Sequence, residues 1–187
     1  MSCNDMTIRP EQPADAPDIN DLHDEAFGPG RFAKTAYRVR EGSLPVEALS
    51  LVAMDEWRLV GSIRFSRINI GEESGALLLG PLAIFRDYGG HRCGLRLMGA
   101  GLELAGEQGF SLALLVGDLA YYQKVGFKKV PAGQIRLPGP VDAERLLAFE
   151  IEAGALAKFQ GMVAVSRIAS QESGRQKAGA PGTQNLS

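Results

Sequence analysis

The chain has 187 residues, a formal net charge of −2, and 45% hydrophobic and 22% charged residues, a composition typical of one soluble globular domain. Its basic residues are scattered, so nothing indicates a nucleic-acid partner. The longest apolar run, residues 76–85, is about half as long as a membrane-spanning helix, and the first residues lack the basic and apolar segments of a secretion signal. We therefore expect a cytoplasmic protein without a membrane partner. Two histidines and two cysteines, Cys3 and Cys93, fit neither a metal site nor a disulfide framework.

Strands and helices alternate in the predicted first half of the chain. Residues 7–9 alternate briefly, as in a strand, and a proline-bearing lead-in follows them. Apolar residues at helical spacing then predict a helix that ends near Phe27, before a Gly-Pro-Gly sequence. A short second helix is predicted over residues 31–40. The segments 49–54 and 59–70 predict the two strands of a hairpin.

The apolar run at 76–85 predicts a long, mostly buried strand that contains Gly80-Pro81. Because proline cannot donate a hydrogen bond to a sheet, this pair indicates a bulge or a place where neighbouring strands part. Such a break in the sheet could receive a ligand.

The second half predicts a glycine-containing turn, two more helices and further strands. The predicted elements are a turn at 89–94, a helix that ends near Gly109, a central strand at 110–116, a short helix at 118–125, and strands around 136–138 and 162–168. Residues 169–187 lack aromatic side chains and are rich in Ser, Gln, Gly and Ala, which predicts a disordered tail. We therefore expect one domain over residues 1–168.

The predicted strand, turn and helix around residues 78–105 form the segment that indicates a ligand-binding site. A glycine turn at a helix N-terminus presents free N–H groups and the positive end of the helix dipole, which favours a phosphate or diphosphate. The same turn is also common as a plain connection. A Rossmann fingerprint is excluded because its G-x-G-x-x-G spacing is absent.

Two segments resemble signatures of the GCN5-related N-acetyltransferases (GNAT family): residues 80–94 and residues 116–127, the latter reading VGDLAYYQKVGF. The resemblance extends over roughly residues 7–168. It implies an α/β fold with a mixed, mostly antiparallel central sheet, splayed strands and flanking helices. It also implies acetyl-CoA as co-substrate, no metal, and a monomer or homodimer.

The resemblance assigns the coenzyme site to the long strand and the turn after it. The main chain of Leu82, Ala83 and Ile84 would bind the pantetheine arm. The diphosphate would lie against the turn formed by Gly89, Gly90, His91, Arg92, Cys93 and Gly94. Two positions depart from the family pattern: Gly89 stands where Gln or Arg is usual, and Arg92 where glycine is usual. Arg92 either contributes a charged contact to phosphate or hinders the approach of the coenzyme.

Tyr122 matches the position of the family's general acid, which protonates the departing thiolate. The alternative is a packing aromatic. Tyr121 is rotated by about 100° around the helix and is the weaker candidate. Asp118 is interpreted as a helix N-cap rather than a base. No residue is an evident base for the amine: His23, Asp24 and Glu25 on the first predicted helix are possible candidates. Cys93 is interpreted as a packing residue rather than a reactive thiol.

The resemblance implies an N-acetyltransferase, in which a primary amine of an unknown small molecule or protein attacks the thioester directly. Two alternatives remain open at this point. The departures at Gly89 and Arg92 are also compatible with a non-catalytic acyl-CoA-binding regulator, and less so with a scaffold that has lost the coenzyme. The sequence of the phosphate-binding turn alone does not distinguish the enzyme, the regulator and the scaffold.

Overall fold

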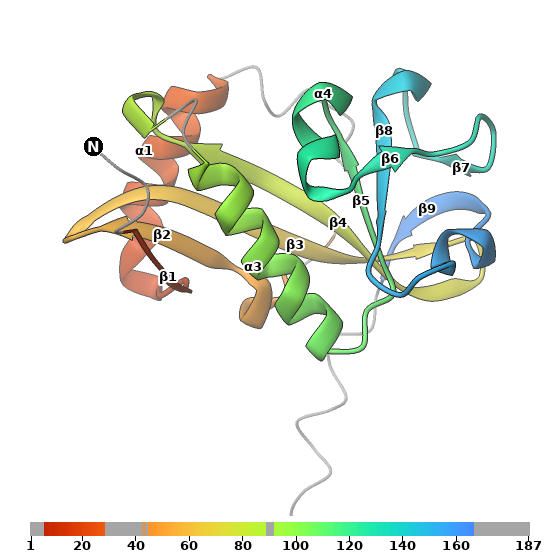
Figure 1. Cartoon of the computed structure of the whole chain (residues 1–187), viewed down its shortest axis with the longest axis horizontal. Helices are drawn as coiled ribbons and strands as arrows, with labels where there is room; N and C mark the ends of the chain where they lie inside the picture. Colours follow the sequence, from red (N-terminus) through yellow and green to blue (C-terminus); the bar gives the residue numbers. More distant parts are fainter. Residues whose placement is uncertain (1–5, 29–42, 44, 89–91, 167–187) are drawn as a thin grey trace, which may run out of the picture.

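The computed structural model describes residues 6–28, 43, 45–88 and 92–166. Within these residues nine strands form one mixed sheet, in which the main path runs β1-β2-β3-β4-β5-β8-β6 and β9 pairs with both β3 and β7 (Figure 1). The strands are β1 (Thr7–Pro10), β2 (Leu51–Asp55), β3 (Arg58–Ile70), β4 (Glu73–Ile84), β5 (Leu112–Val116), β6 (Lys128–Lys129), β7 (Ile135–Arg136), β8 (Leu146–Glu150) and β9 (Gly161–Val165). Among the described strands, only the pairs β4–β5 and β7–β9 are parallel. The predicted mixed, mostly antiparallel sheet is confirmed.

Three helices accompany the sheet in the described part of the chain: α1 (Ala16–Phe27), α3 (Cys93–Glu107) and α4 (Leu119–Tyr122). Short 3-10 turns follow or precede several elements, including η4 (Arg86–Tyr88), η5 (Gln123–Val125) and η6 (Ala143–Arg145). The first helix and the one after the glycine turn end within two residues of their predicted ends. The predicted helix over 31–40 and the predicted tail at 169–187 lie outside the described residues.

The helices cover opposite faces of the sheet. Figure 1 shows α3 lying across the front of the sheet with α1 behind it. The larger core cluster lies under α3 and includes Phe65, Leu79 and Leu97, all at most 2% exposed. On the opposite face, Ile19 and Leu22 of α1 pack against Val52, while a separate cluster joins β5 and β9 at the far end of the sheet. Because both faces of the sheet are covered, its central strands need apolar side chains on both sides. This explains the nearly continuous apolar runs in β4 and β5.

The predicted irregularity at Gly80-Pro81 is confirmed as a bulge in β4. The register passes from Phe65↔Leu79 to Ile63↔Leu82, so two residues of β4 lie opposite the single residue Arg64 of β3. The backbone of Gly80 has φ 121°, a conformation that side-chain-bearing residues rarely adopt. The sequence therefore places a glycine where the bulge requires one.

Candidate active site

The strands β4 and β5 part at their C-terminal ends. Their parallel ladder includes only three residue pairs and ends at Leu78↔Leu114. Beyond it, β4 continues to Ile84 with β3 as its partner, and β5 continues to Val116 with β8 as its partner. The two facing edges therefore leave an opening between strands of the same sheet, as the sequence predicted from Gly80-Pro81.

Peptide groups of β4 that face this opening can be identified from the backbone hydrogen bonds. The N–H of Phe85 donates to the C=O of Val60 in β3 at 3.0 Å. Because peptide groups alternate in direction along a strand, the N–H and C=O of Ala83 also face β3. Those of Leu82 and Ile84 consequently face the opening. Of the three residues expected to bind through their main chain, this geometry favours Leu82 and Ile84 over Ala83.

The N-terminus of α3 lies after the C-terminal end of β4. Arg92 is the N-cap residue; its side chain is exposed and makes no capping hydrogen bond. Cys93 and Gly94 follow in the first turn, and both are buried. Gly89, Gly90 and His91, the other expected residues of the turn, lie outside the described residues. The first N–H groups of a helix have no acceptor within the helix, so this end of α3 favours an anionic ligand.

Cys93 corrects one expectation. Its side chain is fully buried, as a packing residue should be, but it is also disulfide-bonded. The composition had argued against a disulfide because two distant cysteines form no recognisable framework. The chain's other cysteine, Cys3, lies outside the described residues. A sulfur held in a disulfide has no thiolate to offer, so Cys93 is not a nucleophile in this state.

Helix α4 begins and ends as predicted. The carboxylate of Asp118 accepts a hydrogen bond from the N–H of Ala120 at 2.9 Å, which makes Asp118 the N-cap. At the other end Gly126 adopts φ 100° and closes η5. These two signals fix the place of the aromatic pair between them.

The two tyrosines of α4 point to different surroundings. A Cβ placed on Gly117 would lie 2.2 Å from Cε2 of Tyr122, so the Tyr122 ring packs over the residue that follows β5. The same ring meets Phe127 edge-on at 5.9 Å between centroids. Tyr121 instead approaches α3: a Cβ on Gly94 would lie 2.3 Å from its hydroxyl oxygen. Burial raises the pKa of the Tyr121 phenol.

The candidate bases on α1 have unequal surroundings. His23 is buried, and its Nε2 lies 2.9 Å from the Ser62 hydroxyl of β3, while its ring meets Phe27 edge-on. Asp24 and Glu25 are exposed, and a Glu25 carboxylate oxygen accepts a hydrogen bond from the N–H of Arg86 at 3.5 Å. These contacts favour a structural role for His23 within the core.

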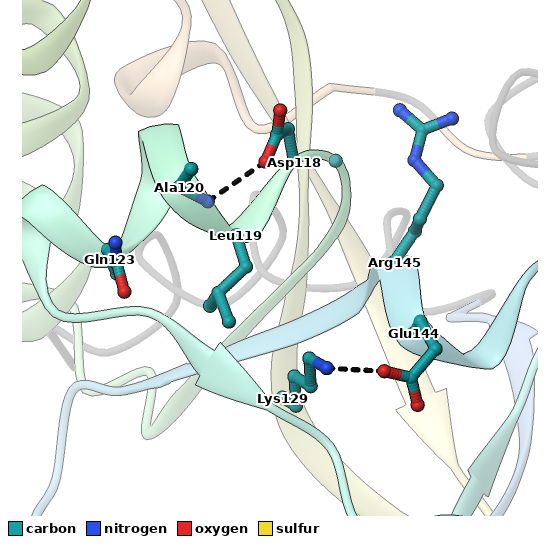
Figure 2. Close-up of a pocket in the computed structure, with 8 residues that line it drawn as sticks. Asp118, Leu119, Ala120, Gln123, Lys129, Glu144 and Arg145 are labelled. Carbon is teal, nitrogen blue, oxygen red and sulfur yellow. Dashed lines mark hydrogen bonds and ion pairs between the residues drawn. The ribbon is translucent and has the colours of Figure 1, made fainter.

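A solvent-facing pocket of about 570 Å³ lies between α4, β6 and η6. Its lining includes Asp118, Gln123, Lys129, Glu144 and Arg145, and Lys129 is ion-paired with Glu144 (Figure 2). Figure 2 shows the Arg145 side chain extending away from that pair. The N–H of Gly117 donates to the C=O of Arg145 at 2.9 Å, which joins the pocket to the end of β5. Sequence reasoning missed its charged residues, because scattered charges in a loop carry no recognisable spacing.

Neither a metal centre nor a membrane helix is found in the part of the chain that the structure describes. Within it no three His, Cys, Asp or Glu side chains lie close enough together to hold a metal ion. No described helix is both long and apolar enough to cross a bilayer.

Comparison with known proteins identifies relatives of similar length. No protein-family model matches the chain. An Escherichia coli K12 protein named as the uncharacterized N-acetyltransferase YhbS is 30% identical over 160 residues, which cover 84% of this chain and 95% of YhbS. A second Escherichia coli K12 protein, named as the uncharacterized N-acetyltransferase YjhQ, is 32% identical over 143 residues, which cover 75% of this chain and 78% of YjhQ.

Solved structures show the same fold. The crystal structure of Escherichia coli YhbS in complex with CoA matches with a TM-score of 0.75 and 27% identity, covering 86% of this chain and 89% of that chain. A GNAT family acetyltransferase from Brucella melitensis in complex with acetyl-CoA matches with a TM-score of 0.56 and 29% identity, covering 78% of this chain and 96% of that chain. The extent of these similarities, together with the splayed strands and the aromatic pair on α4, shows that the chain belongs to the GCN5-related N-acetyltransferase family.

Proposed function

We propose that this protein transfers an acetyl group from acetyl-CoA to a primary amine of a small molecule or protein. The observation that carries the proposal is the opening between β4 and β5, where the peptide groups of Leu82 and Ile84 point away from β3 and have no ladder partner among the described residues. On the same side of the sheet end, Tyr121 of α4 reaches the first turn of α3. Relatives whose structures contain CoA or acetyl-CoA support the same function.

The residues of the opening fit an acyl-coenzyme A thioester. The pantetheine arm carries amide groups, which can pair with the peptide groups of β4 that face the opening, as an added strand would. The diphosphate is an anion, and the N-terminus of α3 with its exposed Arg92 offers N–H groups and a positive charge. No metal is required, because acyl transfer from a thioester needs no Lewis acid when hydrogen-bond donors stabilise the oxyanion.

Each group has a distinct part in the reaction. A main-chain N–H of Leu82 or Ile84 polarises the thioester carbonyl and stabilises the negative oxygen as the amine nitrogen attacks the carbonyl carbon. The C–S bond then breaks, and Tyr122 donates its phenol proton to the departing thiolate. The amine loses its proton to water, since no carboxylate or histidine among the described residues of the opening stands out as a base. Tyr122 regains a proton from solvent before the next turnover.

Replacing Tyr122 with phenylalanine tests this assignment. The variant keeps the ring that packs over Gly117 and against Phe127, so the fold should persist while kcat falls about 100-fold. Tyr88→Phe is a control for the loss of a tyrosine hydroxyl elsewhere, because the Tyr88 hydroxyl donates to Asp55 at the end of β2. Release of free thiol from acetyl-CoA is measured with a panel of amines under conditions in which chemistry limits the rate. Equal kcat for wild type and Tyr122→Phe would reduce Tyr122 to a packing residue.

The same assay separates the alternatives left open by the sequence. Thiol release that depends on an amine supports the enzyme, whereas acetyl-CoA binding without turnover over the whole amine panel supports a regulator. Absence of binding in calorimetry at about 1 mM coenzyme supports a scaffold that has lost the coenzyme, because a coenzyme that the protein uses must bind its native state. The acceptor, the oligomeric state and the cytoplasm as compartment remain predictions.

A further inference from the structure

The hydroxyl of Tyr121, at the end of α4, lies close to the first turn of α3 and to Ile84 of β4. Tyr121 is partly buried, and its oxygen makes no hydrogen bond to any residue that the structure describes. A Cβ on Gly94 would lie 2.3 Å from this oxygen and 3.5 Å from Cγ1 of Ile84. The hydroxyl therefore lies between α4, the first turn of α3 and the splayed end of β4.

Glycine at position 94 makes this approach possible. Gly94 has no positive φ, so its backbone conformation would suit any residue in a helix. What distinguishes glycine here is the space that its missing side chain leaves for the Tyr121 hydroxyl. A phenylalanine at position 121 would leave the ring 3.6 Å from a Cβ at 94, which is ordinary van der Waals contact.

Two basic residues belong to the elements that meet at this hydroxyl, Lys124 in η5 and Arg92 at the N-terminus of α3. Lys124 carries its ammonium 5.9 Å from the centre of the Tyr121 ring, and its side chain is exposed. Arg92, also exposed, caps the α3 terminus next to Cys93 and Gly94. Because burial raises the pKa of Tyr121, its phenol stays protonated at neutral pH and can donate a hydrogen bond.

We propose that Tyr121 binds the coenzyme, donating a hydrogen bond from its hydroxyl to the diphosphate where the pantetheine arm joins it. This inference rests on the proposed function and assigns the two adjacent tyrosines different tasks: Tyr121 holds the donor substrate, and Tyr122 transfers the proton.

Calorimetric titration with coenzyme A tests the assignment. Tyr121→Phe should bind coenzyme A about tenfold more weakly than wild type, the effect of losing one hydrogen bond to a charged acceptor. Pantetheine, which lacks the diphosphate, should bind both proteins with equal affinity in competition with coenzyme A. Tyr122→Phe should show the opposite division, with a loss in kcat and little change in affinity. Unchanged affinity of Tyr121→Phe for coenzyme A would overturn the inference, and so would an equal loss of affinity for pantetheine.

A second pair of variants keeps the test independent of one substitution. Gly94→Ala forces the hydroxyl away from α3 and should weaken coenzyme A binding as much as Tyr121→Phe. In the double variant the clash is removed, so its affinity should equal that of Tyr121→Phe alone, a non-additive result. Additive losses would show that Gly94 and Tyr121 act separately and would contradict the proposal. If wild-type protein itself fails to bind coenzyme A, the proposed function fails and this inference with it.

Discussion

Two glycines on α3 provide a sharp test of how tightly this helix packs on the sheet. Gly101 faces the fully buried ring of Phe65 in β3, and a Cβ placed on it would lie 2.5 Å from Cε2 and 2.8 Å from Cζ. Gly99 lies on the same helix, and no atom of the described residues comes within 4 Å of the position that its Cβ would take. The same substitution to alanine therefore has opposite expected effects at two positions only two residues apart.

The magnitudes follow from two competing effects. Alanine stabilises a helix interior over glycine by about 1 kcal/mol, a gain available at both positions. At Gly101 the new methyl group also overpacks the core, which costs about 1–3 kcal/mol because the fully buried ring of Phe65 must shift to make room. Gly99→Ala should therefore raise Tm by about 2–4 °C. Gly101→Ala should be less stable than Gly99→Ala by about 1–3 kcal/mol.

Urea unfolding followed by circular dichroism measures both variants against wild type. If the slope m of the unfolding free energy against urea concentration is the same for all three proteins, a shifted midpoint reports a change in stability alone. If Gly101→Ala is as stable as Gly99→Ala, the close packing of α3 on Phe65 is wrong.

Two further predictions concern charge. The Asp15 carboxylate accepts two hydrogen bonds from Arg9, at 2.7 and 2.8 Å, and one from the N–H of Gln12, and the bonds from Arg9 are the main cause of its lowered pKa. Its contribution to stability is therefore present above the unfolded pKa, about 3.9, and is lost as pH falls through the lower folded value. Asp15→Asn should cost about 1–3 kcal/mol at pH 7 and flatten the acid side of a stability profile measured between about pH 2 and 6; an unchanged profile would contradict this. Arg92→Gly should weaken coenzyme A binding about threefold to tenfold, and less so at high salt, whereas tighter binding would identify Arg92 as an obstruction.

Local signals predicted most of the fold around the site. The glycine-proline pair in an apolar run predicted the bulge and the opening, because these residue types have few other uses within a strand. Asp118 and Gly126 predicted the limits of the short helix and its turn for similarly local reasons. Such elements depend on backbone preferences that act within a few residues, so one sequence suffices to locate them.

The features of the fold and the site that the sequence did not predict depend on contacts between distant segments. Strand β8, only five residues long, follows a proline-rich stretch and becomes a strand through pairing with β5, thirty-odd positions earlier in the chain. The different surroundings of Tyr121 and Tyr122 were equally hidden, because the position of Tyr121 depends on Gly94 in another helix. Likewise, Ala83 could be distinguished from Leu82 and Ile84 only once the hydrogen bond from Phe85 to Val60 was known.

The bulge in β4 shifts by one residue the alternation that decides on which face of the sheet each side chain lies. By placing two residues opposite Arg64, it brings Leu79 and Leu82, three positions apart, onto the same face of the sheet. With one residue fewer, Leu82 and Ile84 would turn toward α1, and their peptide groups would pair with β3 while those of Ala83 faced the opening. A single deletion there would leave nearly every residue of the site in the sequence and yet reverse which of them meet a ligand. The register of one strand, rather than any side chain, thus decides which atoms of this protein are available for chemistry.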